Sequence, residues 1–184
     1  MMRRTALLLL LAVAGCSSPD PVLYTLRATD GPTRTPATRA VVLRRPSLPR
    51  YLDRNAIVTA MPGYKVETSG GERWAEPIGS MFARVLVQDL AQRLPRTTVL
   101  NDQTAVSVPN ATGIDLDVQE FGPDGTGAVV LRAQAAIDPA RGPAPPVLPV
   151  RIVVRPAGTT TADLVGAMSE ATGRLADALA TALR

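Results

Sequence analysis

One amphipathic segment, residues 78–94, constrains the fold of this chain more than any other part of the sequence. Pro77 suits the first turn of a helix, because its ring presets φ and its missing N–H has no partner inside a helix. Pro95 ends the pattern, since the residue before a proline avoids helical angles. Polar residues such as Arg84 and Arg93 fall outside the apolar stripe, so we expect one face on a core and the other in water. The stripe consists of Ile78, Met81, Phe82, Val85, Leu86, Leu90 and Leu94.

The stretch before this helix, Glu72–Pro77, contains the only tryptophan of the chain. Trp74 is flanked by Arg73 and, two residues later, by Glu76. One interpretation is that Trp74 covers the edge of the core while the charges are solvated. The other is an exposed recognition element, because Trp and Arg are the residue types that dominate protein interfaces. The sequence leaves both open.

The N-terminal residues 1–15 are typical of a signal peptide. Two arginines precede an apolar run over residues 6–14, which is too short to remain as a membrane-spanning helix. The run ends in the tetrapeptide Val-Ala-Gly-Cys at Cys16, which resembles the lipobox of bacterial lipoproteins. We therefore expect cleavage before Cys16, followed by lipid attachment (palmitate among the acyl chains) to this residue. Several chains would make the anchoring durable.

Cys16 is followed by Ser17 rather than by an aspartate. By resemblance to lipoprotein sorting in Gram-negative bacteria, this favours an outer-membrane lipoprotein whose domain faces the periplasm. Because Cys16 is the only cysteine, no disulfide framework is expected. Residues 16–21 are interpreted as a lipidated tether, and residues 22–184 are long enough for a single domain with a core of its own.

The pattern after the tether alternates short strands with two helices. The segment 56–61 should form a hairpin with 64–68, after which Gly70-Gly71 releases the chain toward Trp74. Thr160 and Asp163 resemble a capping box at the start of a second, alanine-rich helix. These patterns predict an α/β fold, a two-layer domain with a mixed sheet of about seven short strands and two amphipathic helices. The segments with strand patterns lie near residues 22–26, 39–44, 56–61, 64–68, 97–100, 114–119, 129–137 and 150–155.

The composition argues against an enzyme. The chain has no histidine, which removes the commonest general base and most zinc sites. Asp115 and Asp117 point to the same side of a strand, which could suggest a metal or acid/base site. Carboxylates that alternate with apolar residues along a strand, however, usually just lie on its solvent-facing side. The glycine-bearing stretch 122–127 joins two strands and does not fit a dinucleotide fingerprint. We therefore predict no catalytic residues, no cofactor and no metal site.

Nucleic acid is also a poor candidate partner. The formal net charge is only +4, aromatic residues make up 3% of the chain, and no basic tract is present. Proteins that bind nucleic acid usually show a clustered basic surface or aromatic stacking platforms.

Two stretches resemble a known family. Residues 45–54, Arg-Pro-Ser-Leu-Pro-Arg-Tyr-Leu-Asp-Arg, precede Ile57-Val58-Thr59, and Arg73-Trp-Ala-Glu-Pro77 precedes the first helix. In this order, behind a lipobox, they resemble the ABC-type transport auxiliary lipoproteins, also described as PqiC-like or membrane-integrity transporter lipoproteins. An early Tyr-Thr-Leu at residues 24–26 and the closing helix around residues 175–179 agree with this resemblance.

The resemblance implies an auxiliary subunit of an MCE-type ABC lipid transport system between the inner and outer membranes. The implied partners are an MCE-domain transport protein and its ABC transporter, with the outer membrane reached through the lipid anchor and a homo-oligomer as a further option. A periplasmic lipid-binding carrier and a structural cell-envelope lipoprotein remain alternatives. We expect the 46–54 loop and the 73–77 stretch to lie close together. The candidate interface residues are Tyr51, Asp53, Arg54, Arg73, Trp74 and Glu76.

Overall fold

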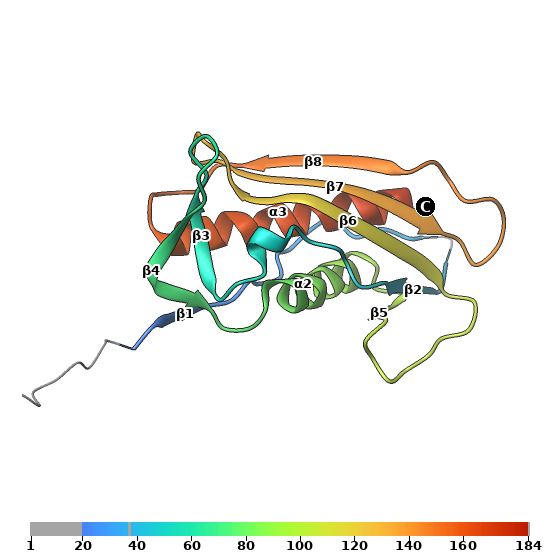
Figure 1. The fold of residues 1–184 in the computed structure, drawn as a ribbon. Coiled ribbons are helices and arrows are strands. Elements are labelled where there is room, and N and C mark those ends of the chain that lie inside the picture. Colours follow the sequence, from blue (N-terminus) through green and yellow to red (C-terminus); the bar gives the residue numbers. More distant parts are fainter. Residues whose placement is uncertain (1–19, 37, 184) are drawn as a thin grey trace, which may run out of the picture.

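The computed structural model describes residues 20–36 and 38–183 (Figure 1). The leader, Cys16 and most of the tether predicted above lie outside these residues. The core extends from Leu26 to Leu183, so the chain from Ser17 onward contains all of it. In chain order the elements are β1 (Val22–Tyr24), β2 (Ala40–Leu43), the 3-10 turn η2 (Arg50–Leu52), β3 (Ala56–Ala60), β4 (Glu67–Trp74), α2 (Ile78–Arg93), β5 (Thr98–Asn101), β6 (Thr112–Pro123), β7 (Val129–Asp138), β8 (Leu148–Val154) and α3 (Thr161–Ala182).

Five strands form a large mixed sheet in the order β5-β2-β6-β7-β8. β2 pairs in parallel with β5 and with β6, whereas β6, β7 and β8 are antiparallel neighbours. Successive side chains of a strand point to opposite faces. Along β6, Leu116 is accordingly buried while Asp115 and Asp117 are exposed. The large sheet therefore has one apolar face and one hydrated face.

Both helices cover the apolar face of this sheet (Figure 1). α3 lies against β6, β7 and β8, α2 lies against β5, and the two helices contact one another. Phe82 of α2 meets Phe121 of β6 edge to face, with ring centroids 5.1 Å apart. Pro77 stands just before the first helical turn of α2 rather than within it. The capping box of Thr160 and Asp163 is present at the start of α3, as the sequence predicted.

A smaller sheet has the order β1-β4-β3, with β4 in the centre. The sequence predicted that Gly70-Gly71 would end the hairpin, and this was wrong. β4 continues through both glycines because its last residues, Glu72–Trp74, pair in parallel with Val22–Tyr24. The partner strand comes from far earlier in the chain, and no local pattern announces such a pairing.

The predicted fold class is confirmed: an α/β domain in which two amphipathic helices pack on a mixed sheet. The strands of the described residues number eight and are divided between sheets of five and three strands, where the sequence predicted about seven in one sheet. Among residues 20–36 and 38–183, no helix has the length and apolar character needed to cross a bilayer.

Arg93 contradicts the prediction that it faces water, since only 1% of it is exposed. The segment between β1 and β2 passes over the end of α2 and covers the guanidinium. Nη1 of Arg93 donates to the backbone carbonyl of Thr29 at 2.9 Å, and Nε donates to the carboxylate of Asp177 in α3 at 2.5 Å. An arginine outside the apolar stripe of α2 therefore joins three parts of the chain.

Asp89, one helical turn before Arg93, is fully buried and completes this group. Its Oδ1 accepts the backbone N–H of Thr29 at 2.8 Å and lies 3.3 Å from Nη1 of Arg93. Burial raises the pKa of the Asp89 carboxyl, and the bond from Thr29 and the charge of Arg93 oppose this rise. Gly31 is required at its position, because a Cβ there would overlap the Arg93 guanidinium. We call Asp89, Arg93, Asp177 and the backbone of Thr29 the Arg93 cluster.

Candidate functional site

The two stretches singled out by the sequence lie side by side, as predicted. The backbone N–H of Trp74 donates to the carbonyl of Asn55 at 2.8 Å, directly after the 46–54 loop. Ala56 of β3 is the register partner of Arg73 in β4. On the other side, β1 pairs with the same end of β4, and the N–H of Ala75 donates to the carbonyl of Tyr24 at 2.9 Å. The small sheet therefore brings both stretches to one corner of the molecule.

The 46–54 loop contains the short helical turn η2, which positions Tyr51 and Leu52. Leu52 is buried and fixes this turn to the core, while Tyr51 is half-buried. Burial raises the pKa of the Tyr51 phenol, and a backbone group of Phe121 opposes the rise. Asp53 and Arg54 follow the turn and are exposed. The loop thus presents a carboxylate and a guanidinium to solvent beside a partly covered aromatic ring.

Trp74 is buried, with 7% of its surface exposed, and belongs to the hydrophobic core. The interpretation of Trp74 as an exposed recognition element is therefore wrong for the single chain, and the core interpretation applies. The reason is strand alternation: Arg73 points outward from the end of β4, so its neighbour Trp74 points inward. Its indole covers the edge of the core next to the start of α2.

The charged residues of the two stretches do not pair with one another. Glu76 forms its ion pair with Arg84 of α2 rather than with Arg54. Among the described residues, Asp53, Arg54 and Arg73 make no ion pair with one another or with a third side chain. Their charges are consequently available to solvent or to a partner.

Glu72 is a structural residue that the sequence did not single out for a role. Its carboxylate accepts hydroxyl hydrogen bonds from Thr161 at 2.5 Å, Ser69 at 2.7 Å and Tyr24 at 2.9 Å. These bonds, with that from Thr161 the largest, hold the pKa of Glu72 below its ordinary value of 4.5. Three elements, β1, β4 and α3, are tied together at one carboxylate. Their separation in the chain left no local signal.

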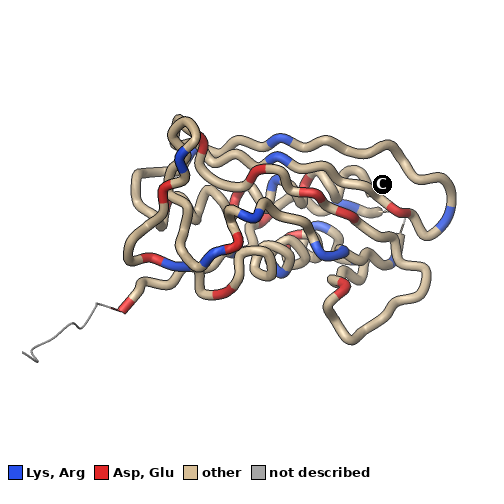
Figure 2. The backbone as a smooth tube through the Cα atoms, in the orientation of Figure 1, with Lys and Arg blue, Asp and Glu red and all other residues tan. Residues whose placement is uncertain are grey.

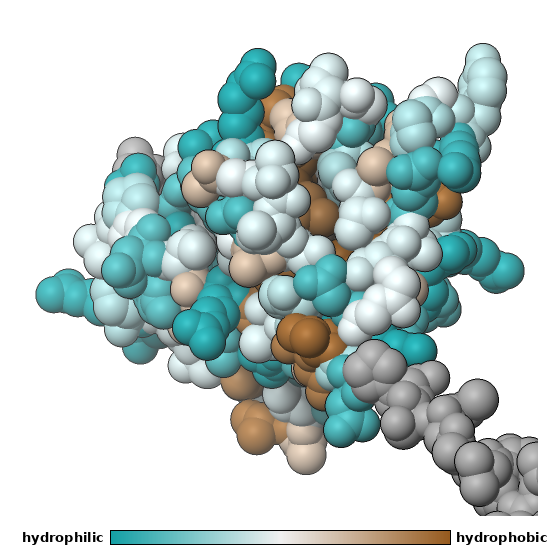
Figure 3. Space-filling model, turned by 90° about the vertical axis from the view of Figure 1, so that its left-hand side faces the viewer, coloured by the Kyte–Doolittle hydropathy of each residue, from teal (hydrophilic) through white to brown (hydrophobic). Residues whose placement is uncertain are grey.

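We call the solvent-facing residues Tyr51, Asp53, Arg54, Arg73 and Glu76 the corner patch. Figure 2 shows residues of both charge signs gathered at this corner, around the ends of β1 and β4. Figure 3 views the same end of the molecule and shows apolar side chains low on a largely hydrophilic face. Val22 and Leu23 of β1 are 55% and 60% exposed. A surface with mixed charges beside exposed apolar residues suits protein contact.

Other polar groups that could suggest chemistry are engaged in the fold. Asp115 and Asp138 both bind the guanidinium of Arg44 at 2.5 Å, and Asp117 accepts a hydrogen bond from Ser47. Within residues 20–36 and 38–183, no group of three or more potential ligands could hold a metal ion. The carboxylates on the hydrated face of the large sheet thus connect strands and the 46–54 loop.

The comparison with protein families decides the assignment. Residues 24–180 match the family model for the ABC-type transport auxiliary lipoprotein component. The chain belongs to this family. The match covers every strand and helix described above except the outermost residues of β1 and α3. It confirms the resemblance seen in the sequence, and the family is one of transport auxiliary components.

Two solved structures share the fold of this auxiliary lipoprotein. An uncharacterized protein has a TM-score of 0.74 at 16% identity, covering 90% of this chain and 99% of the other. A Xanthomonas campestris protein of the DUF330 family has a TM-score of 0.65 at 18% identity, covering 86% of this chain and 92% of the other. At such identities the likeness shows the fold alone. A search among curated proteins finds no match.

Because Trp74 is buried, we predict that Trp74→Ala lowers the free energy of unfolding by about 3–5 kcal/mol, as for other large-to-small changes in a core. Tyr64, which is fully exposed at the tip of the β3–β4 turn, is the matched control: Tyr64→Ala should change stability by less than about 0.5 kcal/mol. Thermal unfolding and size exclusion on the same sample of residues 17–184 provide the measurement. An unchanged melting temperature with altered assembly would restore the interface interpretation.

Proposed function

We propose that this protein is an outer-membrane-anchored auxiliary subunit of an MCE-type ABC lipid transport system. Lipid on Cys16 holds the domain at the outer membrane, and the domain docks the periplasmic MCE-domain protein. The single observation that carries the proposal is the family match over residues 24–180. Residues 13–16, which resemble a lipobox, agree with it. The match itself supports only the coarser statement of a transport auxiliary lipoprotein.

The position of the corner patch supports a docking role. β1, which pairs with β4 at this corner, begins six residues after Cys16. An extended residue spans at most about 3.6 Å, so the first residue of β1 stays within about 22 Å of Cys16. A partner bound at the corner patch would therefore be held close to the membrane that carries the anchor. Unpaired charges such as Arg54 and Arg73 suit recognition, because complementary charges steer encounter and fix orientation.

The buried Trp74 contributes to this role from beneath the surface. Its side chain belongs to the core at the end of β4, and its backbone N–H donates to the carbonyl of Asn55, which holds the two stretches together. Glu76 is held by Arg84, so its position is fixed as well. The backbone beneath the patch is therefore preorganised, which lowers the conformational entropy lost on binding.

The alternative of a lipid carrier is not favoured. A carrier would need an enclosed apolar cavity, and the alanine-rich α3 packs closely on the sheet instead, with Ala171, Ala176 and Ala180 fully buried. The hollow of about 1080 Å³ that the described residues form is an open groove with a mixed polar and apolar lining.

The anchoring part of the proposal predicts that Cys16→Ser releases the protein from the outer membrane. Fractionation of cells expressing wild type and variant provides the measurement. Ser17→Ala is the control and should remain with the outer membrane. Quantitative recovery of the Cys16 variant in the outer-membrane fraction would contradict lipid anchoring at this residue.

The docking part predicts that Arg73→Glu weakens co-purification with the MCE-domain protein of the same host at least tenfold, a change of about 1.4 kcal/mol in binding free energy. Arg151→Glu, on the hydrated face of β8, is the matched charge-reversal control and should bind as wild type does. Equal recovery with both variants would show that the corner patch does not dock this partner.

A further inference from the structure

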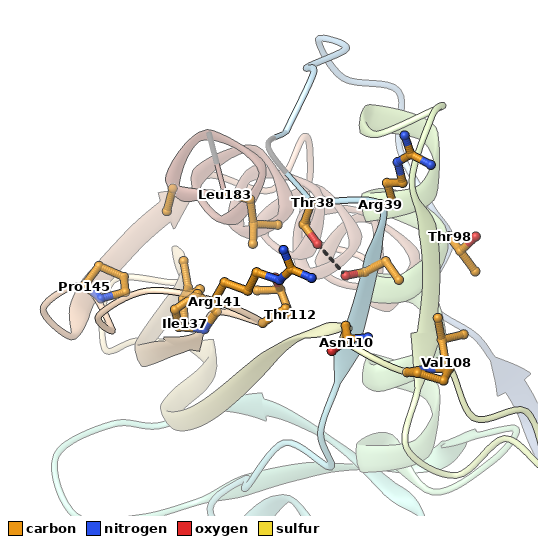
Figure 4. A pocket seen from close by; sticks show the side chains of 15 residues that line it. Thr38, Arg39, Thr98, Val108, Asn110, Thr112, Ile137, Arg141, Pro145 and Leu183 are labelled. Atoms are coloured by element: carbon orange, nitrogen blue, oxygen red, sulfur yellow. Dashed lines mark hydrogen bonds between the residues drawn. The ribbon is translucent and has the colours of Figure 1, made fainter.

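A groove at the end of the molecule opposite β1 is not explained by the proposed anchoring or by the corner patch. It lies where β2 and β6 begin and β7 and α3 end, between two irregular loops (Figure 4). Its volume is about 1080 Å³. One wall is formed by the loop before β6, including Val108 and Asn110, and the other by the proline-rich loop after β7, including Arg141 and Pro145. We call this hollow the end groove.

The charge of the end groove is entirely positive in the part that the structure describes. Arg39 and Arg141 line it, and no aspartate or glutamate does. In Figure 4 the side chain of Arg141 crosses the hollow, and its guanidinium lies near Thr38 and Thr112. Asp138, adjacent to this wall in the sequence, is bound to Arg44 at 2.5 Å. The groove consequently offers a cation without a carboxylate partner from the described lining.

Thr112 at the start of β6 provides a second and independent observation. Only 5% of this residue is exposed, and it lines the groove. Within the described residues its hydroxyl makes no hydrogen bond, although the neighbouring Thr38 hydroxyl donates to the Ala40 carbonyl at 2.9 Å. Because Thr112 lines the groove, its hydroxyl can donate a hydrogen bond to a group bound there. Arg141 and Thr112 therefore present a donor pair that suits an anionic group.

The other residues that line the end groove indicate which chemical class of ligand could bind there. Ile137, Pro145 and Leu183 supply apolar surface, interrupted by the hydroxyl of Thr98 and the amide of Asn110. An acyl chain in this open groove would remain half in water, and an inorganic anion would leave the apolar surface uncovered. An extended polypeptide alternates its side chains between two sides and can meet both kinds of surface.

We propose that the end groove binds an extended, acidic polypeptide segment, with a carboxylate held between the Arg141 guanidinium and the Thr112 hydroxyl. Apolar side chains next to that carboxylate lie against Ile137 and Leu183. The positive lining selects acidic over basic segments by charge complementarity. The proposed function is needed only to say that the segment belongs to a transport partner; binding itself can be measured without that assumption.

The test uses residues 17–184 and a fluorescein-labelled decapeptide of alternating Glu and Val, with an alternating Lys and Val peptide as its counterpart. Fluorescence anisotropy should show saturable binding of the acidic peptide alone, weaker at high salt because the charges are screened. Arg141→Glu should weaken binding at least tenfold. Thr112→Val, which replaces the hydroxyl with a methyl group, should weaken it several-fold. Arg27→Glu, an exposed residue outside the groove, should leave it unchanged.

Backbone amide shifts in NMR spectra identify the place of binding even if a variant is poorly folded: the acidic peptide should shift Val108, Thr112 and Arg141. The inference is overturned if both peptides bind equally, or if Arg141→Glu binds as wild type does. It is also overturned if only inorganic phosphate or phosphatidylglycerol vesicles shift these amides, which would make the groove an anion or membrane site. A different pair of results would contradict only the proposed docking at the corner patch. In that case the acidic peptide binds in an Arg141-dependent way, while the Arg73→Glu variant still co-purifies with the MCE-domain protein as wild type does.

Discussion

The buried Arg93 cluster is the interaction on which the arrangement of the domain depends. Burying a guanidinium and a carboxylate away from water costs free energy unless the two charges and their hydrogen-bonding groups have partners. Here α2 supplies Asp89 and Arg93, α3 supplies Asp177, and the segment before β2 supplies the backbone of Thr29. Arg93 also lies in the last turn of α2, where the helix dipole favours a positive charge. Loss of Arg93 would leave the fully buried carboxylate of Asp89 without an opposite charge.

The cluster also fixes the two surfaces to which we assign binding. The segment it holds connects β1 at the corner patch with Thr38 and Arg39 at the end groove (Figure 1). A second contact, from the N–H of Arg34 to the carbonyl of Arg93 at 2.6 Å, holds the same segment further along. The middle of the segment is thus attached to both α2 and α3. A subunit that positions a partner relative to a membrane needs such a rigid frame.

Local patterns in the sequence were sufficient to predict the helices and strands that form the layers of the fold. The apolar stripe of residues 78–94, the Thr160–Asp163 capping box and the alternation around Leu116 each identify an element from its own residues. Such patterns do not predict the burial of a side chain whose contacts come from residues far away in the sequence. Arg93 is polar and off the stripe, so it was predicted to be hydrated; Trp74 is flanked by charges, so its burial could not be decided. For Glu72 and Thr112, the relevant neighbours come together only in the folded chain.

The most direct test of the central role of the Arg93 cluster is the free energy of unfolding of Arg93→Ala from urea denaturation of residues 17–184. Arg96→Ala, an exposed arginine just beyond the same helix, is the matched control. Removal of one member of a buried ion pair typically costs about 3–5 kcal/mol. We therefore predict a loss of that size for Arg93→Ala and a change below about 0.5 kcal/mol for the control. Equal stabilities of the two variants would contradict the account.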